Sequence, residues 1–136
     1  MGTAVENSMG NTKKAVMIIL AVVLGEITLI LLTTVAQEIM FDGIDYYSSP
    51  LSDIFFGGLA TFLAAVLAGM AAAVLVKGTS RAPHLIISLI ILLETIYLLA
   101  SGILNGPLWF DLLSAIALIV GVWAGHYAAR SFIYGL

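Results

Sequence analysis

Two acidic residues lie in the middle of long apolar segments, where ionised side chains are rare. Glu26 lies 12 residues after Lys14, and Glu94 lies 13 residues after Arg81. If both segments cross a bilayer, the two carboxyls have nearly equal depth near its midplane. An ionised, lipid-facing carboxylate there costs about 2.5 kcal/mol or more. Each acid must therefore be protonated, paired or in contact with water.

Each acid is followed by further polar residues at helical spacing. Spacings of 7 and 11 residues return to one helix face, which places Glu26, Thr33 and Gln37 on one stripe. The second stripe consists of Glu94, Tyr97, Ser101 and Asn105. No Lys or Arg lies at the depth of either acid, so we expect both stripes to turn toward the bundle interior or toward a protomer interface.

These stripes have two possible roles, one functional and one structural. In the first, the carboxyls form a site for protons, a cation or a cationic ligand, because paired carboxyls can exchange a proton for a positive charge. In the second, protonated glutamates hold helices together through hydrogen bonds, as glutamine would.

Other candidate sites carry weaker chemical signals. His84 and His126 are expected near the same membrane boundary on neighbouring helices, and they are weak candidates for metal or haem ligands; interfacial histidine is the alternative. The chain has no cysteine, which excludes disulfides and thiolate metal sites. No H-E-x-x-H, G-x-S-x-G or P-loop motif is present, so the sequence leans against an enzyme and implies no cofactor.

The composition requires a membrane. Of 136 residues, 62% are hydrophobic and 10% are charged, against roughly 45 to 50% and 25% in soluble domains. Mean hydropathy is +1.15. The apolar residues form four blocks of about 20 residues or more, which predict membrane-crossing helices at residues 15–36, 54–76, 85–104 and 108–129. We therefore predict an all-α antiparallel bundle of four transmembrane helices over residues 15–136, preceded by a polar arm at 1–14.

The basic residues predict the orientation of this bundle. All five lie on one side when the chain is threaded in order: Lys13, Lys14, Lys77, Arg81 and Arg130. By the positive-inside rule, both termini are cytoplasmic in a multi-pass protein of the cell membrane. No basic cluster is interleaved with aromatic residues, so nucleic acid is not an expected partner.

Small residues recur every four positions in the second and fourth segments. Such seams allow close helix packing, and we expect this role for Gly57, Gly69, Gly121 and Gly125. A seam can face its own chain or a second protomer, so a homo-oligomer or a larger membrane complex is expected.

The chain also contains a possible internal repeat. A shift of 68 residues aligns Glu26 with Glu94, Thr33 with Ser101, and Gln37 with Asn105. Duplication of a helical hairpin explains this match, and so does the general similarity of apolar membrane sequences.

The run Gly25-Glu26-Ile27-Thr28 through Thr33-Thr34, in a small four-span chain, resembles the small multidrug resistance transporters. In that family a glutamate of the first helix exchanges protons for cationic drugs across a dimer. The family's aromatic drug-site residues have no clear counterpart here, and Glu94 is foreign to its pattern. The sequence thus favours a helix-packing accessory or assembly subunit with buried carboxyls, with a proton-coupled small transporter or ligand-binding membrane protein as the alternative.

Overall fold

The structure, a computed structural model, describes residues 2–104 and 106–136, with side chains from residue 10 onward. Its helices are α1 (Gly2–Thr34), α2 (Leu51–Leu75), α3 (Ala82–Ser101) and α4 (Leu108–Ala128); the π-helical turns η1 (Val35–Ile39) and η2 (Ala129–Ile133) extend α1 and α4. No strand occurs in the described residues. Four helices are long and apolar enough to cross a membrane. The prediction of an all-α, four-helix membrane bundle is confirmed.

Proline and glycine set several of the helix boundaries. Pro50 and Pro107 immediately precede α2 and α4, and Pro83 lies in the first turn of α3, where a missing N–H leaves no intrahelical bond unmade. Gly102 ends α3 in the left-handed conformation with φ of 71°, which favours glycine. The third span therefore ends three residues before the predicted 104.

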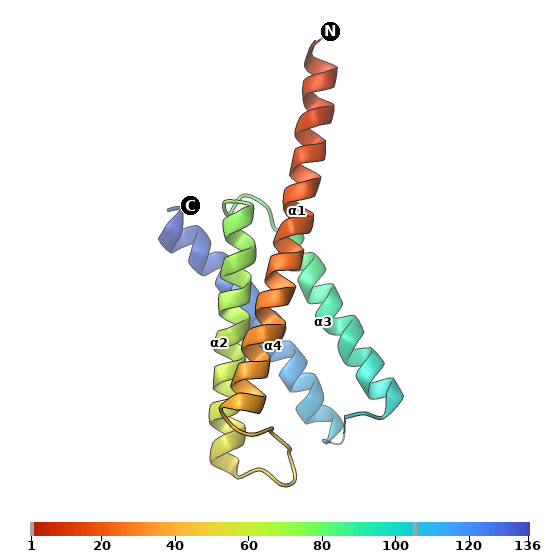
Figure 1. Cartoon of the computed structure of the whole chain (residues 1–136), viewed down its shortest axis with the longest axis vertical. Coiled ribbons are helices and arrows are strands. Elements are labelled where there is room, and N and C mark those ends of the chain that lie inside the picture. The colour runs from red at the N-terminus through yellow and green to blue at the C-terminus, as the bar shows by residue number, and fades with distance from the viewer. Residues whose placement is uncertain (1, 105) are drawn as a thin grey trace.

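The predicted boundary at residue 14 is not a break in the helix. Residues 2–14 belong to α1, which continues without interruption into the apolar segment. Figure 1 shows this part of α1 projecting beyond the other helices. The polar arm is thus helical and leaves the bundle in line with the first span.

The connections define two ends of the bundle. The start of α1, the C-terminal residues and the loop 76–81 lie at one end, here called the termini side. The loop 40–50 and the described residues between α3 and α4 (102–104 and 106–107) lie at the opposite end, here called the loop side (Figure 1). At the termini side, the Tyr134 hydroxyl donates to the Val74 carbonyl at 3.2 Å, which ties the end of the chain to α2.

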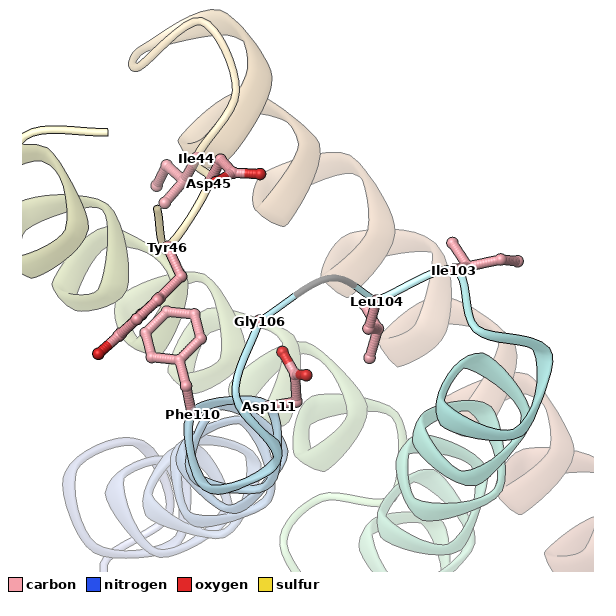
Figure 2. A pocket seen from close by; sticks show the side chains of 8 residues that line it. All are labelled: Ile44, Asp45, Tyr46, Ile103, Leu104, Gly106, Phe110 and Asp111. Atoms are coloured by element: carbon pink, nitrogen blue, oxygen red, sulfur yellow. The ribbon is translucent and has the colours of Figure 1, made fainter. Parts of the chain in front are cut away.

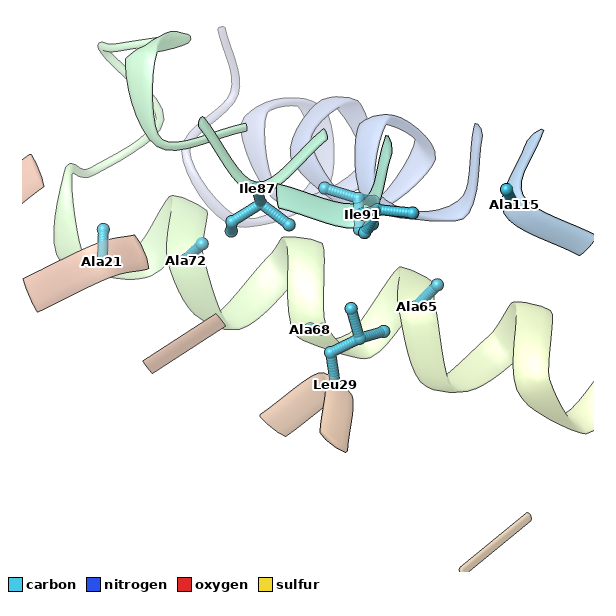
Figure 3. Close-up of a cluster of buried hydrophobic side chains, with 9 residues drawn as sticks. Ala21, Leu29, Ala65, Ala68, Ala72, Ile87, Ile91 and Ala115 are labelled. Atoms are coloured by element: carbon cyan, nitrogen blue, oxygen red, sulfur yellow. The ribbon is translucent and has the colours of Figure 1, made fainter. Parts of the chain in front are cut away.

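The core consists of small side chains from α2 packed against larger ones from its neighbours. Ile87 and Ile91 of α3 point toward α2, and Leu29 of α1 approaches the same helix (Figure 3). The α2 surface at this place is formed by Ala65, Ala68 and Ala72, all buried. Short side chains let the backbones approach closely, and packing contacts then hold the helices together without a hydrophobic driving force.

Helix α3 is packed along only half of its length. Its buried residues are Pro83, His84, Ile87 and Ile91. Beyond Ile91, none of the described α3 residues is buried, and Figure 1 shows this part of α3 diverging from α1 and α2. The contact of α3 with α4 is correspondingly smaller than that of α1 with α2, so the two helical hairpins are packed differently.

Candidate functional site

Two polar side chains of the α1 stripe form hydrogen bonds within the chain. The Thr33 hydroxyl donates to the Leu29 carbonyl at 2.6 Å. Gln37 donates through Nε2 to the Thr61 hydroxyl of α2 at 3.2 Å, and Thr61 donates to the Gly57 carbonyl at 2.7 Å. Gln37 therefore links η1 to α2.

Glu26 lies where α1 meets two other helices. A Cβ added to its neighbour Gly25 would lie 2.6 Å from Ile87 Cδ1 and 3.2 Å from the Ala72 Cβ, so the glycine permits a close crossing of α1 with α2 and α3. Beside this crossing, Oε1 of Glu26 is buried and has no hydrogen-bond partner among the described residues. The sequence interpretation singled out Glu26, but nothing in it showed that Gly25 positions it.

Glu94 lies on the packed face of α3, at the height where packing ends. Seven residues separate it from the buried Ile87, and at about 100° per residue this spacing returns to within roughly 20° of the same direction. Glu94 is nevertheless exposed, because α3 diverges beyond Ile91.

The remaining α3 stripe is also uncovered. Tyr97 is 67% exposed, and Ser101 is exposed while its hydroxyl donates to the Leu98 carbonyl at 3.1 Å. The expectation that both stripes turn into the bundle is therefore wrong for α3 within a single chain. The physical reason is the divergence of this helix. Asn105 lies outside the described residues.

We refer to the group formed by Glu26, Glu94, Tyr97 and Ser101 as the α1–α3 polar face; its three α3 residues are exposed, and Glu26 is half-buried. Counting at about 1.5 Å per residue, Glu94 lies about 18 Å from Ala82 and about 10 Å from Ser101 along the α3 axis. The face thus extends from the middle of the helix toward the loop side. Its α3 residues bring a carboxyl, a phenol and a hydroxyl to one exposed side of that helix.

The two histidines meet inside the bundle on the termini side. Their ring centroids are 4.4 Å apart, and their exposed fractions are 0% for His84 and 1% for His126. Nε2 of His84 lies 2.8 Å from the Gly69 carbonyl oxygen, and it must be the donor because a carbonyl only accepts. Both nitrogens of His126 and Nδ1 of His84 have no partner among the described residues.

The histidine pair falls short of a metal centre. Zinc sites in proteins have three or four protein ligands, and no group of three His, Cys, Asp or Glu residues in the described chain could hold a metal ion. Trp123 packs beside both rings and donates through Nε1 to the Ser88 hydroxyl at 3.0 Å. The pair is thus part of the α3–α4 packing.

The glycine seams face each other within the chain. A Cβ at Gly69 would overlap the Val122 carbonyl oxygen, and one at Gly125 would overlap the Val66 carbonyl oxygen. At Gly121 the nearest atom would be the Ala65 Cβ at 2.7 Å. Gly57 differs from the other three, because it lies against Ile44 of the loop 40–50 rather than against α4.

A small cavity on the loop side was not anticipated from the sequence. It has a volume of about 190 Å³, and Asp45 and Tyr46 line it opposite Phe110 and Asp111 (Figure 2). Backbone N–H groups of Tyr47 and Ser48 donate to the Asp45 carboxylate at 2.8 and 3.1 Å, and they lower the pKa of this exposed group. The Asx-turn spacing of Asp45 was the available signal, but it predicts a turn and not a cavity.

Comparison with known proteins gives no relative for this arrangement. The chain matches no protein-family profile, no curated protein and no solved structure.

Proposed function

We propose that the protein is an assembly subunit of a membrane complex and that it binds its partner through the α1–α3 polar face. The single observation that supports this role is the exposure of the loop-side half of α3, where Glu94 and Tyr97 lie within a candidate membrane span. A polar face of this kind is unstable against lipid tails and becomes favourable once another protein covers it.

The cost of leaving Glu94 in lipid is large on the scale of membrane-protein interactions. Insertion scales give about 2.5 to 3.5 kcal/mol for an ionised side chain at the centre of a helix. A single interhelical hydrogen bond contributes about 0.6 to 2 kcal/mol. One hydrogen bond from Tyr97 or a neighbour therefore does not compensate for Glu94, whereas a partner that covers the whole face does.

In this proposal the termini side faces the cytoplasm of a cell-membrane protein. All five basic residues belong to that side, namely Lys13, Lys14, Lys77, Arg81 and Arg130, and positively charged segments are retained there. The partner accordingly contacts α3 from the middle of the bilayer toward the outer leaflet.

Photo-crosslinking in native membranes tests the assembly role. A benzophenone side chain replaces Tyr97 on the polar face, and the control replaces Ile96, which lies about 180° from Ile87 on the same helix and is 53% exposed. We expect a discrete protein adduct from position 97 and lipid adducts from position 96. Lipid adducts from both positions would refute the assembly role.

A second function is favoured by a different observation: Oε1 of Glu26 is buried and has no hydrogen-bond partner among the described residues, and the second acid within a candidate span, Glu94, is exposed. Two such carboxyls are suited to exchanging protons for a cation, as in a small proton-coupled transporter. Uptake of candidate cations into proteoliposomes under a pH gradient tests this alternative. Uptake should be abolished in E26Q and E94Q, because their amides cannot release a proton. Equal uptake by wild type and both variants would rule out the transporter alternative.

A further inference from the structure

We propose that the buried pair of His84 and His126 is a pH-sensitive contact between α3 and α4. While both rings are neutral the pair holds the two helices together, and protonation of either ring separates the helices at the termini side. His84 lies about 15 Å from Glu94 along the axis of α3. The inference therefore concerns a different part of the bundle from the α1–α3 polar face and does not depend on the assembly role.

The first argument is the burial of both rings at one helix contact. Their centroids are 4.4 Å apart, and neither side chain is more than 1% exposed. The ring of Trp123 lies 5.8 Å from each imidazole, centroid to centroid, and its indole N–H donates to the Ser88 hydroxyl of α3 at 3.0 Å. Separation of α3 from α4 would therefore bring both imidazoles to water and break this hydrogen bond.

The second argument is the hydrogen bonding of the two rings. His84 donates from Nε2 to the Gly69 carbonyl, so its Nδ1 carries no proton when the ring is neutral. This Nδ1 and both nitrogens of His126 have no partner among the described residues. A protonated imidazole carries an N–H donor on each nitrogen. Protonation of either ring in this arrangement would thus bury a charge together with a donor that lacks an acceptor, and both are unfavourable.

The third argument is the charge on the helices that carry the pair. Arg81 lies three residues before His84 at the start of α3, and Arg130 of η2 lies four residues after His126. These spacings place each arginine about one helical turn from a ring, on a neighbouring part of the same helix face. A proton on either imidazole would therefore be repelled by a nearby cation.

The chain places few anions near these charges. No Asp or Glu occurs in residues 7–25, 54–93 or 112–136. Glu26 is the acid of α1 to consider, because its neighbour Gly25 lies against Ile87 of α3; its buried Oε1 has no hydrogen-bond partner among the described residues. The other ionisable side chains on the elements around the pair are cations and phenols, namely Lys13, Lys14, Lys77, Arg81, Tyr127, Arg130 and Tyr134.

The sign of the pH dependence follows from access to water. An imidazole in water is protonated below about pH 6.5, so the separated helices bind protons in acid and the closed contact excludes them. The contact is therefore complete above this pH and weakens as the pH falls below it. Each ring favours separation by up to about tenfold per pH unit. Between pH 7.5 and 5.5 the two rings together contribute up to about a hundredfold.

Unfolding of the full-length protein in detergent measures this shift. The equilibrium constant for unfolding by sodium dodecyl sulfate is compared at pH 7.5 and 5.5 for wild type, H126F and the double variant H84Q/H126F. Glutamine at position 84 keeps an N–H donor for the Gly69 carbonyl. Division by the change in the double variant removes the response of the carboxyls. The remaining increase should approach a hundredfold in wild type and about tenfold in H126F.

Hydrogen exchange of the two indole N–H groups locates the change. Exchange at Trp123 should accelerate on acidification in wild type relative to the double variant, because its bond to Ser88 spans the α3–α4 contact. Exchange at Trp109, in the first turn of α4 on the loop side, should be the same in both proteins. E26Q is the matched control, since it removes the carboxyl of α1 and should retain both pH responses.

Three results would overturn the inference. Equal pH responses of wild type and the double variant would show that the pair does not govern the contact. Loss of the response in E26Q would assign it to the carboxyl, and equal acceleration at Trp109 and Trp123 would indicate unfolding of the whole bundle. Should the double variant fail to fold, H84Q and H126F are each compared with wild type; each should lose about tenfold of the response, and an undiminished response in both would refute the proposal.

Discussion

Substitution of Gly69 by alanine tests the close α2–α4 contact most sharply. The added Cβ would overlap the carbonyl oxygen of Val122. This oxygen belongs to the backbone of α4, which cannot rotate away as a flexible side chain can. Overpacking of this kind costs about 1 to 3 kcal/mol. Alanine recovers about 0.5 to 1 kcal/mol of helix propensity relative to glycine. The two terms together give a net loss between about 0 and 2.5 kcal/mol. Because the overlap is with backbone, we expect the upper part of this range, about 2 kcal/mol, which is a factor of roughly 30 in the folded-to-unfolded ratio.

Gly58 provides a matched control in the same helix. It is exposed, and a Cβ there would meet no atom within 4 Å, so G58A should leave stability unchanged or raise it by up to about 1 kcal/mol. The free energy of unfolding is measured for both variants in detergent micelles by titration with sodium dodecyl sulfate. Helicity by circular dichroism reports the folded fraction.

The seam also predicts an order among its glycines. G125A should resemble G69A, because the new Cβ would overlap the Val66 carbonyl oxygen, while G121A should be milder because its nearest obstacle is the Ala65 side chain at 2.7 Å. Equal stabilities of G69A, G125A and G58A would show that α2 and α4 do not approach as described, and the reasoning from close contact would be refuted.

Three further predictions follow from other parts of the structure. H84L removes the side-chain donor to the Gly69 carbonyl and should destabilise the protein by about 0.5 to 1.5 kcal/mol. H126F keeps an aromatic ring at this position, removes two unpartnered nitrogens and should be neutral or stabilising. Detergent unfolding distinguishes the two variants, and an equal loss of stability in both would contradict this asymmetry. The N–H groups of Tyr47 and Ser48 lower the pKa of Asp45, so the stabilisation of the loop 40–50 by the Asp45 carboxylate is complete above the ordinary pKa of 3.8 and is lost as the pH falls through the lowered pKa. Amide exchange of Tyr47 and Ser48 should therefore accelerate in acid in the wild type but should not follow this titration in D45A. Identical pH profiles of the two proteins would disprove this role of Asp45. Reporter tags at Leu136 and within residues 42–49 should lie in opposite compartments, and tags in the same compartment would reject the four-span topology.

The membrane fold could be predicted because it depends on averages over long segments. Twenty apolar residues suffice to cross a bilayer regardless of which face they present, so the four spans follow from hydropathy alone. The ends of the spans depend on single residues, so their predicted positions were less accurate. Gly102 ends α3 early, whereas η2 continues the last span to Ile133, beyond the predicted 129.

The direction in which each helix packs could not be predicted in the same way. Inside a membrane, lipid-facing and buried positions are both occupied by Leu and Ile, so nothing distinguishes the buried Ile87 from the exposed Leu85 in the sequence. The divergence of α3, and with it the exposure of Glu94, depends on where helices cross rather than on their hydropathy. The meeting of His84 with His126 depends on the same crossing geometry.

The glycine pattern carried more information about packing than the polar pattern did. Small residues at Gly69, Gly121 and Gly125 mark surfaces that fit another backbone, and the structure places all three between α2 and α4. The polar stripes have no such unique partner. Gln37 donates a hydrogen bond to Thr61 on α2. The residue spacing on each helix does not predict this pair, because spacing says nothing about which faces of two helices meet.

If the protein is an assembly subunit, protein and not lipid covers the α1–α3 polar face in the native membrane. The chain has no cysteine, so a spin label attached to a single Cys at Tyr97, or at the control position Ile96, reports one site. Oxygen accessibility of each label is compared in native membranes and after purification into lipid vesicles. We predict low accessibility at 97 in native membranes, which rises on purification, and high accessibility at 96 throughout. Equally high accessibility at 97 and 96 in native membranes would contradict the account.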